Sequence, residues 1–249
     1  MLTDDQKRRY ARNITLAGIG GAGQGKLLAA RVLVVGAGGL GSPCITYLAA
    51  AGVGHIGVVD HDRVELSNLQ RQILHETADI GRFKAESARD RAEEMNPDVK
   101  IHPHVMKLDN ANARELVQQY DLVADGSDNF ATRFAVNEAA LAERKSLVSA
   151  AIRAWEGQLA VFKSHEPQQP CYRCFVGAHP DDERGCNDAG ILGAFAGVMG
   201  SFQALEVIKQ LLGINGLDAG HMLLVDGLTL ATRTTRITRD PSCESCGAR

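Results

Sequence analysis

Residues 32–41 read VLVVGAGGLG, a short apolar run that leads directly into a glycine-rich loop. The run is rich in β-branched residues and ends at Gly36, which indicates a short buried strand, and residues 40–52 show a helical pattern. A glycine loop between a strand and a helix is typical of nucleotide-binding folds, because glycines permit a tight turn and the first N–H groups of the helix face a phosphate. The predicted nucleotide contacts of this loop are Gly36, Gly38, Gly39 and Gly41.

Downstream of the loop, short apolar runs alternate with helical patterns. Strands are predicted at residues 56–60, 99–105, 122–125 and 147–150, with helices at 82–95, 111–119 and 131–143 between them. This alternation is typical of a doubly wound, Rossmann-like α/β fold with a mostly parallel sheet. After Trp155 three further strands, at 158–162, 222–225 and 230–237, predict a C-terminal antiparallel elaboration.

No repeat or low-complexity segment divides the chain, so we predict a single domain over residues 1–249. Residues 1–30 are expected to form an N-terminal helical arm, which begins with a capping box between Thr3 and Gln6. Residues 31–150 would form the nucleotide-binding core, and residues 151–249 a C-terminal portion that carries the paired cysteines.

The composition is that of an ordinary globular protein, with 45% hydrophobic and 23% charged residues. A formal net charge of −3 argues against a general nucleic-acid or anionic-membrane partner, which needs a basic surplus. The polar N-terminus has no apolar signal segment, so we expect a cytoplasmic protein. The apolar run at residues 189–214 is about as long as a membrane span. Gln203, Glu206 and Lys209 give its second half a polar face, which favours a buried core or interface helix.

Asp60 ends the second predicted strand, 24 residues after Gly36, where a carboxylate can accept hydrogen bonds from ribose hydroxyls. Taken with the glycine loop alone, this pattern indicates NAD. Several cations and an acid that follow near other strand ends favour ATP, because a triphosphate has about two more negative charges and needs more cations and a Mg²⁺ ion. These further candidates are Arg71, Lys84 and, as the Mg²⁺ ligand, Asp128, together with the neutral Asn68 and with Arg12 from the N-terminal arm.

Four of the six cysteines stand in two Cys-x-x-Cys pairs, Cys171 with Cys174 and Cys243 with Cys246. In the reducing compartment expected here, disulfides explain these pairs less well than a metal does. Four thiolates suit a tetrahedral Zn²⁺ ion in a closed structural site. Redox-active dithiols or disulfides are the alternatives.

Together these features resemble the MoeB/ThiF/HesA family, bacterial E1-like homologues of the adenylation domain of ubiquitin-activating enzymes. The resemblance covers essentially the whole chain, and its most specific part is the string NLQRQ at residues 68–72. The matching positions are Arg9, Tyr10, Arg12, the loop 36–41, residues 67–72, Lys84, Asp128, Asn129 and both cysteine pairs.

The resemblance implies an adenylyltransferase that uses ATP and Mg²⁺ to adenylate the C-terminal Gly-Gly carboxylate of a small ubiquitin-like sulfur-carrier protein. It implies that Asp60 holds the ribose, that Asn68, Arg71 and Lys84 contact phosphates, and that Asp128 positions Mg²⁺. The carrier would bind to the portion 151–249.

The same resemblance implies a homodimer in which Arg12 reaches into the partner subunit's site. Cys186 lies in a predicted loop; in some relatives a cysteine here links covalently to the carrier and in others it is dispensable. Since the chain ends soon after Cys246, a separate sulfur-donor protein is expected.

Other functions remain as alternatives. An NAD-dependent oxidoreductase with a Rossmann fold would leave Arg12, Arg71 and Lys84 without a role, and a non-catalytic docking module would be expected to lack nucleotide-binding residues. The carrier is undecided: residues 151–158 resemble the molybdopterin branch, whereas residues 183–186 and 197–200 resemble the thiamine branch.

Overall fold

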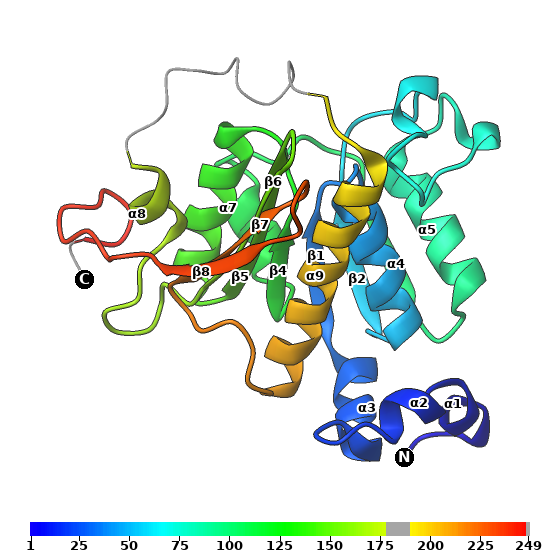
Figure 1. Cartoon of the computed structure of the whole chain (residues 1–249). Coiled ribbons are helices and arrows are strands. Elements are labelled where there is room, and N and C mark those ends of the chain that lie inside the picture. The colour runs from blue at the N-terminus through cyan, green and yellow to red at the C-terminus, as the bar shows by residue number, and fades with distance from the viewer. Residues whose placement is uncertain (178–189, 248–249) are drawn as a thin grey trace.

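The computed structural model describes residues 1–177 and 190–247, which fold around one mixed sheet (Figure 1). The described residues form eight strands in the order β3-β2-β1-β4-β5-β6-β7-β8. Strands β1 to β5 are parallel, and β5 to β8 pair antiparallel. The predicted α/β sheet with an antiparallel C-terminal part is therefore confirmed. The strands are β1 (Arg31–Val35), β2 (His55–Val59), β3 (Lys100–His104), β4 (Leu122–Asp125), β5 (Ser146–Arg153), β6 (Glu156–Phe162), β7 (His221–Asp226) and β8 (Thr232–Arg236).

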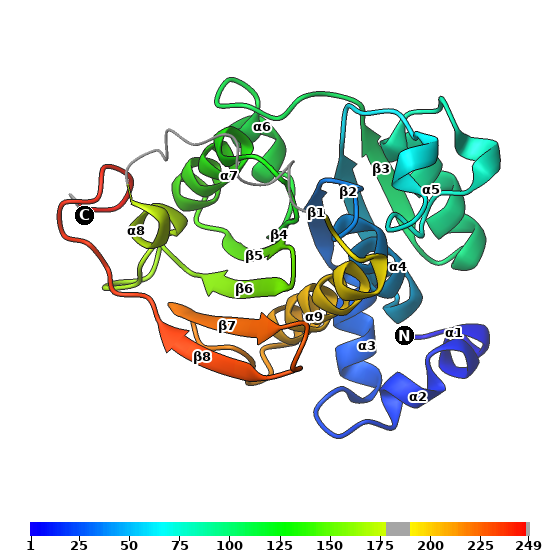
Figure 2. The same ribbon diagram turned by 45° about the horizontal axis from the view of Figure 1, so that its top comes forward.

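Helices lie on both faces of the sheet, as Figure 2 shows. The buried apolar cluster on one face includes side chains from α4, α5 and α9, and the cluster on the other face includes side chains from α6, α7 and α8. The central strands are buried on both faces, which accounts for the continuous apolar run at residues 32–35. The helices are α1 (Asp4–Arg9), α2 (Ala11–Ile14), α3 (Gly20–Ala29), α4 (Gly41–Ala51), α5 (Lys84–Met95), α6 (Ala113–Val117), α7 (Phe130–Ala142), α8 (Tyr172–Val176) and α9 (Gly193–Leu212).

The apolar helix α9 packs along α4 and the sheet (Figure 1). A Cβ at Gly200 would lie 2.3 Å from the Leu40 carbonyl oxygen, so glycine permits this close approach. The buried Gln203 side chain donates hydrogen bonds to the carbonyl oxygens of Asp125 and Val148, at 2.9 and 3.0 Å. No helix within residues 1–177 or 190–247 is both long and apolar enough to cross a membrane. The predicted buried helix is confirmed.

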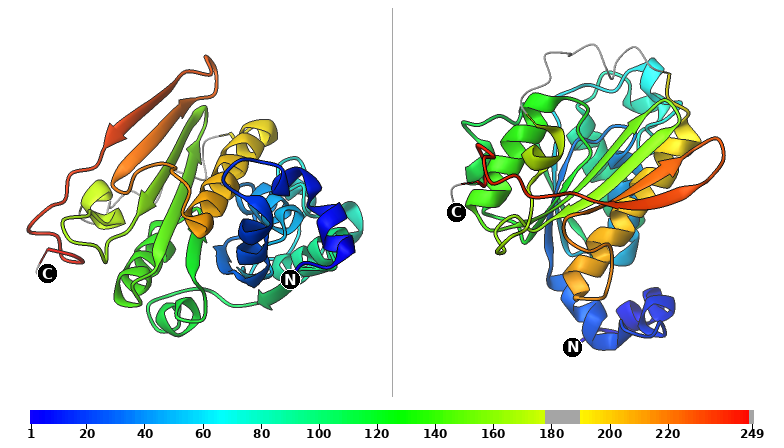
Figure 3. Two further views of the ribbon diagram at one scale, coloured as in Figure 1. Left: turned by 90° about the horizontal axis from the view of Figure 1, so that it is seen from below. Right: turned by 60° about the vertical axis from the view of Figure 1, so that its left-hand side comes forward.

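The N-terminal arm consists of α1, α2 and α3. Its predicted capping box is present, since the Thr3 side chain accepts a hydrogen bond from the Gln6 amide and Gln6 bonds back to Thr3. The arm is attached through Tyr10, which is 2% exposed and donates to an Asp98 carboxylate oxygen at 3.0 Å. Figure 3 shows the arm at one end of the molecule, beside the amino end of β1.

Candidate functional site

A pocket of about 770 Å³ opens at the carboxyl ends of the parallel strands. Its wall includes the last residues of β1 and β2, the segment that follows β4, and part of the β5–β6 hairpin. Ligands of open α/β sheets bind at this edge, and a volume in the range of about 300–1,000 Å³ is typical of small-molecule sites. Many of the predicted site residues line it: Gly36, Gly38, Gly39, Asp60, Arg71, Lys84 and Asp128.

The glycine loop turns sharply from β1 into α4. Gly36 has a φ of +89°, which favours glycine. A Cβ at Gly41 would lie only 1.9 Å from the Gly36 carbonyl oxygen, so Gly41 is required by the close approach of helix and loop. Gly41 is not among the described lining residues of the pocket, so its part in the site is to close the turn.

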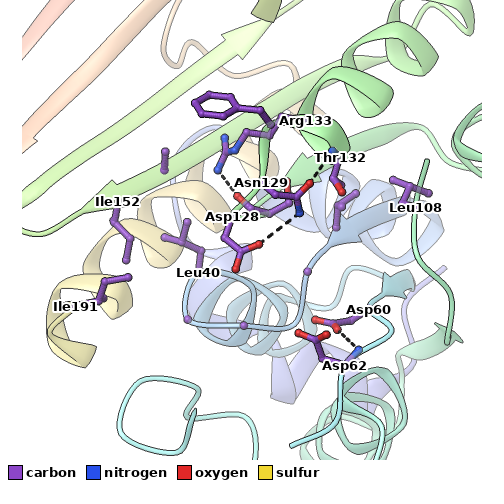
Figure 4. A pocket seen from close by; sticks show the side chains of 18 of the residues that line it. Leu40, Asp60, Asp62, Leu108, Asp128, Asn129, Thr132, Arg133, Ile152 and Ile191 are labelled. Atoms are coloured by element: carbon purple, nitrogen blue, oxygen red, sulfur yellow. Dashed lines mark hydrogen bonds between the residues drawn. The ribbon is translucent and has the colours of Figure 1, made fainter. Parts of the chain in front are cut away.

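Asp60 lies directly after β2 and binds the backbone of the glycine loop. One carboxylate oxygen accepts the Ala37 N–H at 2.8 Å. The other accepts the Asp62 N–H at 2.8 Å (Figure 4). Each carboxylate oxygen has a second lone pair. Asp60 can therefore fix the loop and still accept hydroxyl hydrogens from a ligand.

Two of the predicted cations lie at the same pocket. Lys84, the first residue of α5, is 6% exposed, and its Nζ lies 2.9 Å from an Asp62 carboxylate oxygen. Arg71 donates from its Nη1 to the Ser67 carbonyl oxygen at 3.0 Å. Both can turn their charge toward an anion in the pocket, since each also lines it.

Asp128 lies in the loop after β4 and is exposed at the pocket. Asn129 donates weakly to its carboxylate at 3.5 Å, and the Asn129 side chain also caps α7 by accepting the Thr132 amide at 2.9 Å (Figure 4). The Asp128 carboxylate is therefore positioned by a helix cap and keeps lone pairs that can bind a hard cation.

Two of the predicted residues, Arg12 and Asn68, are not among the described residues that line the pocket. Arg12 is exposed in α2, beside the amino end of β1, so it does not reach the pocket of its own chain (Figure 1). The buried Asn68 side chain accepts the Glu65 amide at 3.2 Å and stabilises its own turn. Cys186 lies outside the described residues.

The four paired cysteines form one cluster at the C-terminal tail. Their sulfur atoms all lie within 4.8 Å of one another, with neighbouring pairs at 3.4, 3.6 and 3.9 Å. A tetrahedral zinc site with Zn–S bonds of about 2.3 Å needs sulfur–sulfur distances of about 3.8 Å. The cluster therefore fits a zinc ion held by Cys171, Cys174, Cys243 and Cys246, as predicted from the spacing.

Residues 10–245 match the sequence profile of the ThiF family. The chain belongs to the ThiF family. The resemblance noted from the residues alone is thus confirmed, and it extends over nearly the whole chain.

Relatives of this ThiF-family chain include a protein of Thermus thermophilus named sulfur carrier protein adenylyltransferase. It is 45% identical over 98% of this chain and 92% of its own length. A protein of the mosquito Culex quinquefasciatus named adenylyltransferase and sulfurtransferase MOCS3 is also 45% identical over 98% of this chain. The matched region covers 56% of the length of this relative.

Solved structures share the fold. The crystal structure of E. coli MccB with AMPCPP and MccA matches with a TM-score of 0.84 and 22% identity, over 96% of this chain and 74% of that one. MccB with ATP matches with a TM-score of 0.82 and 21% identity, over 96% of this chain and 74% of that one. At this level of sequence identity, the matches support the fold of the chain and nothing about its function.

The ThiF-family pocket also has lining residues that the sequence did not predict. Asp62 pairs with Lys84, Lys107 follows β3, and Gln72 is 4% exposed with a side-chain oxygen that bonds to none of the described residues. Arg133, in the first turns of α7, donates hydrogen bonds to the carbonyl oxygens of Ser127 and Ala150 and so stabilises the wall of the pocket. For Lys107 a signal was available, because it comes just beyond a strand end.

Proposed function

We propose that this chain uses ATP to adenylate the C-terminal carboxylate of a ubiquitin-like sulfur-carrier protein that ends in Gly-Gly. The observation that carries the proposal is the pocket of a ThiF-family fold in which Arg71, Lys84 and Asp128 line the same space as the glycine loop. A dinucleotide needs the loop and Asp60, but a triphosphate also needs those charges. The names of the relatives point the same way.

In this proposal the nucleotide follows the strand ends. Gly36, Gly38 and Gly39 lie against its phosphates, and the carboxylate of Asp60 accepts the ribose hydroxyls. Arg71 and Lys84 offset the charge of the triphosphate. Asn68 contributes by fixing the turn that carries Arg71, which is a more indirect part than the family resemblance implies.

The carrier tail would enter from the side of the β5–β6 hairpin, where Arg153, Glu156 and Gln158 line the pocket. A terminal carboxylate has a pKa of about 3.3–3.7 and is already a nucleophile at neutral pH, so no general base is needed. Its oxygen attacks the α-phosphorus, the bond to the bridging oxygen breaks, and pyrophosphate leaves. Positioning and charge stabilisation supply the catalysis.

Asp128 would hold a Mg²⁺ ion, which when bound neutralises phosphate charge as pyrophosphate leaves. Arg12 would act in the partner subunit's site of a homodimer, because it stands too far from the pocket of its own chain. The cysteine cluster would hold a structural zinc ion and join the C-terminal tail to α8. The proposal leaves Cys186 as a candidate thiol for a covalent link to the carrier.

The carrier belongs either to molybdopterin or to thiamine biosynthesis. Each purified carrier, of the molybdopterin and the thiamine type, is incubated with the chain, ATP and Mg²⁺, and its intact mass is measured. We expect one carrier to gain the mass of AMP, and a version without the last glycine to gain nothing. Nicotinamide-dependent reduction without any AMP transfer would contradict the proposal and support an oxidoreductase instead.

A further inference from the structure

His75 is a buried imidazole that the proposed chemistry does not use. It lies in the turn after residues 68–72, is 6% exposed, and contacts two elements of the nucleotide pocket. Its Nε2 lies 3.0 Å from the Ala37 carbonyl oxygen in the glycine loop. Its Nδ1 lies 2.8 Å from the Ser87 hydroxyl in α5.

The contact with Ala37 fixes the orientation of one peptide group. A carbonyl oxygen only accepts hydrogen bonds, so the proton at this contact belongs to Nε2 of His75. The peptide between Ala37 and Gly38 is trans, which directs the Gly38 N–H opposite to the Ala37 carbonyl. Gly38 lines the pocket, whereas His75 stands on the buried side of the loop. The imidazole therefore holds a backbone donor toward the pocket.

The same peptide segment is held from a second direction, because the Ala37 N–H donates to Asp60 at 2.8 Å. The loop is thus tied to the end of β2 by Asp60 and to the turn by His75. The Ala37 carbonyl oxygen also accepts the Ser42 hydroxyl, at 3.3 Å. Together these hydrogen bonds leave little freedom for the loop to rotate its donors away from a phosphate.

The contact with Ser87 ties the loop to the helix that carries Lys84. Ser87 is 1% exposed and lies in the first turn of α5, three residues after Lys84. Lys84 and Gly38 both line the pocket. One imidazole therefore spans the glycine loop and the helix that presents a cation.

We propose that His75 is a positioning residue for triphosphate binding. It holds the glycine loop and the helix that carries Lys84 at a fixed relative position, so that both can contact the phosphates of ATP. This inference rests on the proposed function, since it concerns the same pocket. It predicts that His75 matters for the phosphates of a nucleotide and not for its base and sugar, whereas a purely structural histidine would affect both alike.

The test is titration calorimetry with Mg·ATP and with adenosine, on the full chain. For His75→Ala we expect the Kd of ATP to rise about tenfold or more, as for loss of one hydrogen bond in a phosphate site, while the Kd of adenosine changes by less than about twofold. His75→Gln keeps an amide donor and should recover part of the loss. His55→Ala is the matched control, because His55 is a half-buried, hydrogen-bonded histidine at the opposite end of β2.

Equal weakening of ATP and adenosine in His75→Ala, with no recovery in His75→Gln, would overturn the proposal, and so would unchanged ATP binding. If His75→Ala does not fold, Ser87→Ala decides: selective weakening of ATP supports the proposal and unchanged binding contradicts it. A wild-type chain that binds no ATP would contradict the proposed function as well, whereas normal ATP binding by wild type and both variants contradicts the role of His75 alone.

Discussion

The Nζ of Lys84 lies 2.9 Å from a carboxylate oxygen of Asp62, and the two side chains differ greatly in exposure, at 8% and 55%. The lysine is held in the wall of the pocket, and its partner remains in contact with water. A phosphate that enters the pocket can bind Lys84 without leaving a buried carboxylate unpaired. The pair is therefore suited to a site that binds and releases an anionic ligand.

From this pair we predict that Lys84→Ala lowers ATP–pyrophosphate exchange with little loss of stability. A charged hydrogen bond contributes about 1.5–3 kcal/mol, which corresponds to about a 10- to 160-fold drop in kcat/KM. The exposed Asp62 carboxylate is readily hydrated, so loss of the ion pair itself should change the free energy of unfolding by less than about 1 kcal/mol. The control is Lys100→Ala, an exposed lysine on β3. Exchange at the wild-type rate would remove Lys84 from the site.

The proposed homodimer can be tested by mixing two inactive variants. Arg12→Ala and Asp128→Ala should each lose most exchange activity, because one lacks the cation and the other the Mg²⁺ ligand. If each site takes Arg12 from the partner, equal amounts of the two proteins should recover about a quarter of wild-type activity after subunit exchange. Recovery is measured against unmixed samples. Mixed dimers that form but stay inactive would contradict a shared site.

The cysteine cluster predicts one zinc ion per chain. Cys243→Ser should lose the zinc and release the C-terminal tail, which limited proteolysis would detect, because a closed four-cysteine site joins the tail to α8. Cys44→Ala is the matched control, since Cys44 is fully buried but lies apart from the cluster. Metal analysis measures the zinc. Protein purified without chelators and free of zinc would contradict the prediction.

The attachment of the N-terminal arm should weaken at high pH. Burial raises the pKa of Tyr10 from 10.0 to about 12, which means that the folded state favours the neutral phenol. The stabilisation is therefore complete below pH 10 and is lost as the pH rises from 10 to 12, by about 1.4 kcal/mol per pKa unit of the shift. Denaturant unfolding of wild type and Tyr10→Phe should show a steeper loss for wild type in that interval. Parallel pH profiles would refute this.

Much of the sheet was predictable because buried parallel strands are short apolar runs between helical patterns. The strand at 31–35 and its loop lie where the sequence indicated. The helix α3 was predicted only within a helical arm over residues 1–30 and not with its own bounds, because Gly20, Gly21 and Gly23 have poor helix propensity. Tertiary contacts compensate: Gly23 lets the helix approach Leu212 closely, and the buried Gln24 donates to the Ala51 carbonyl oxygen at 2.9 Å.

The site was predictable where residues follow strand ends, as Asp60 and Asp128 do. The site was less predictable where a side chain contributes by fixing the backbone of a loop. Asn68 turns back on its own backbone, and His75 reaches a glycine loop 38 residues earlier in the chain. Such contacts depend on the path of the turn between β2 and α5, which no local spacing specifies.

The central claim is most directly tested by ATP–pyrophosphate exchange with labelled pyrophosphate. We expect exchange that needs Mg²⁺ and a carrier ending in Gly-Gly, and that disappears when the carrier lacks its last glycine. Exchange that is absent with carriers of both types, from a folded chain that binds ATP, would contradict adenylation as the function of this pocket.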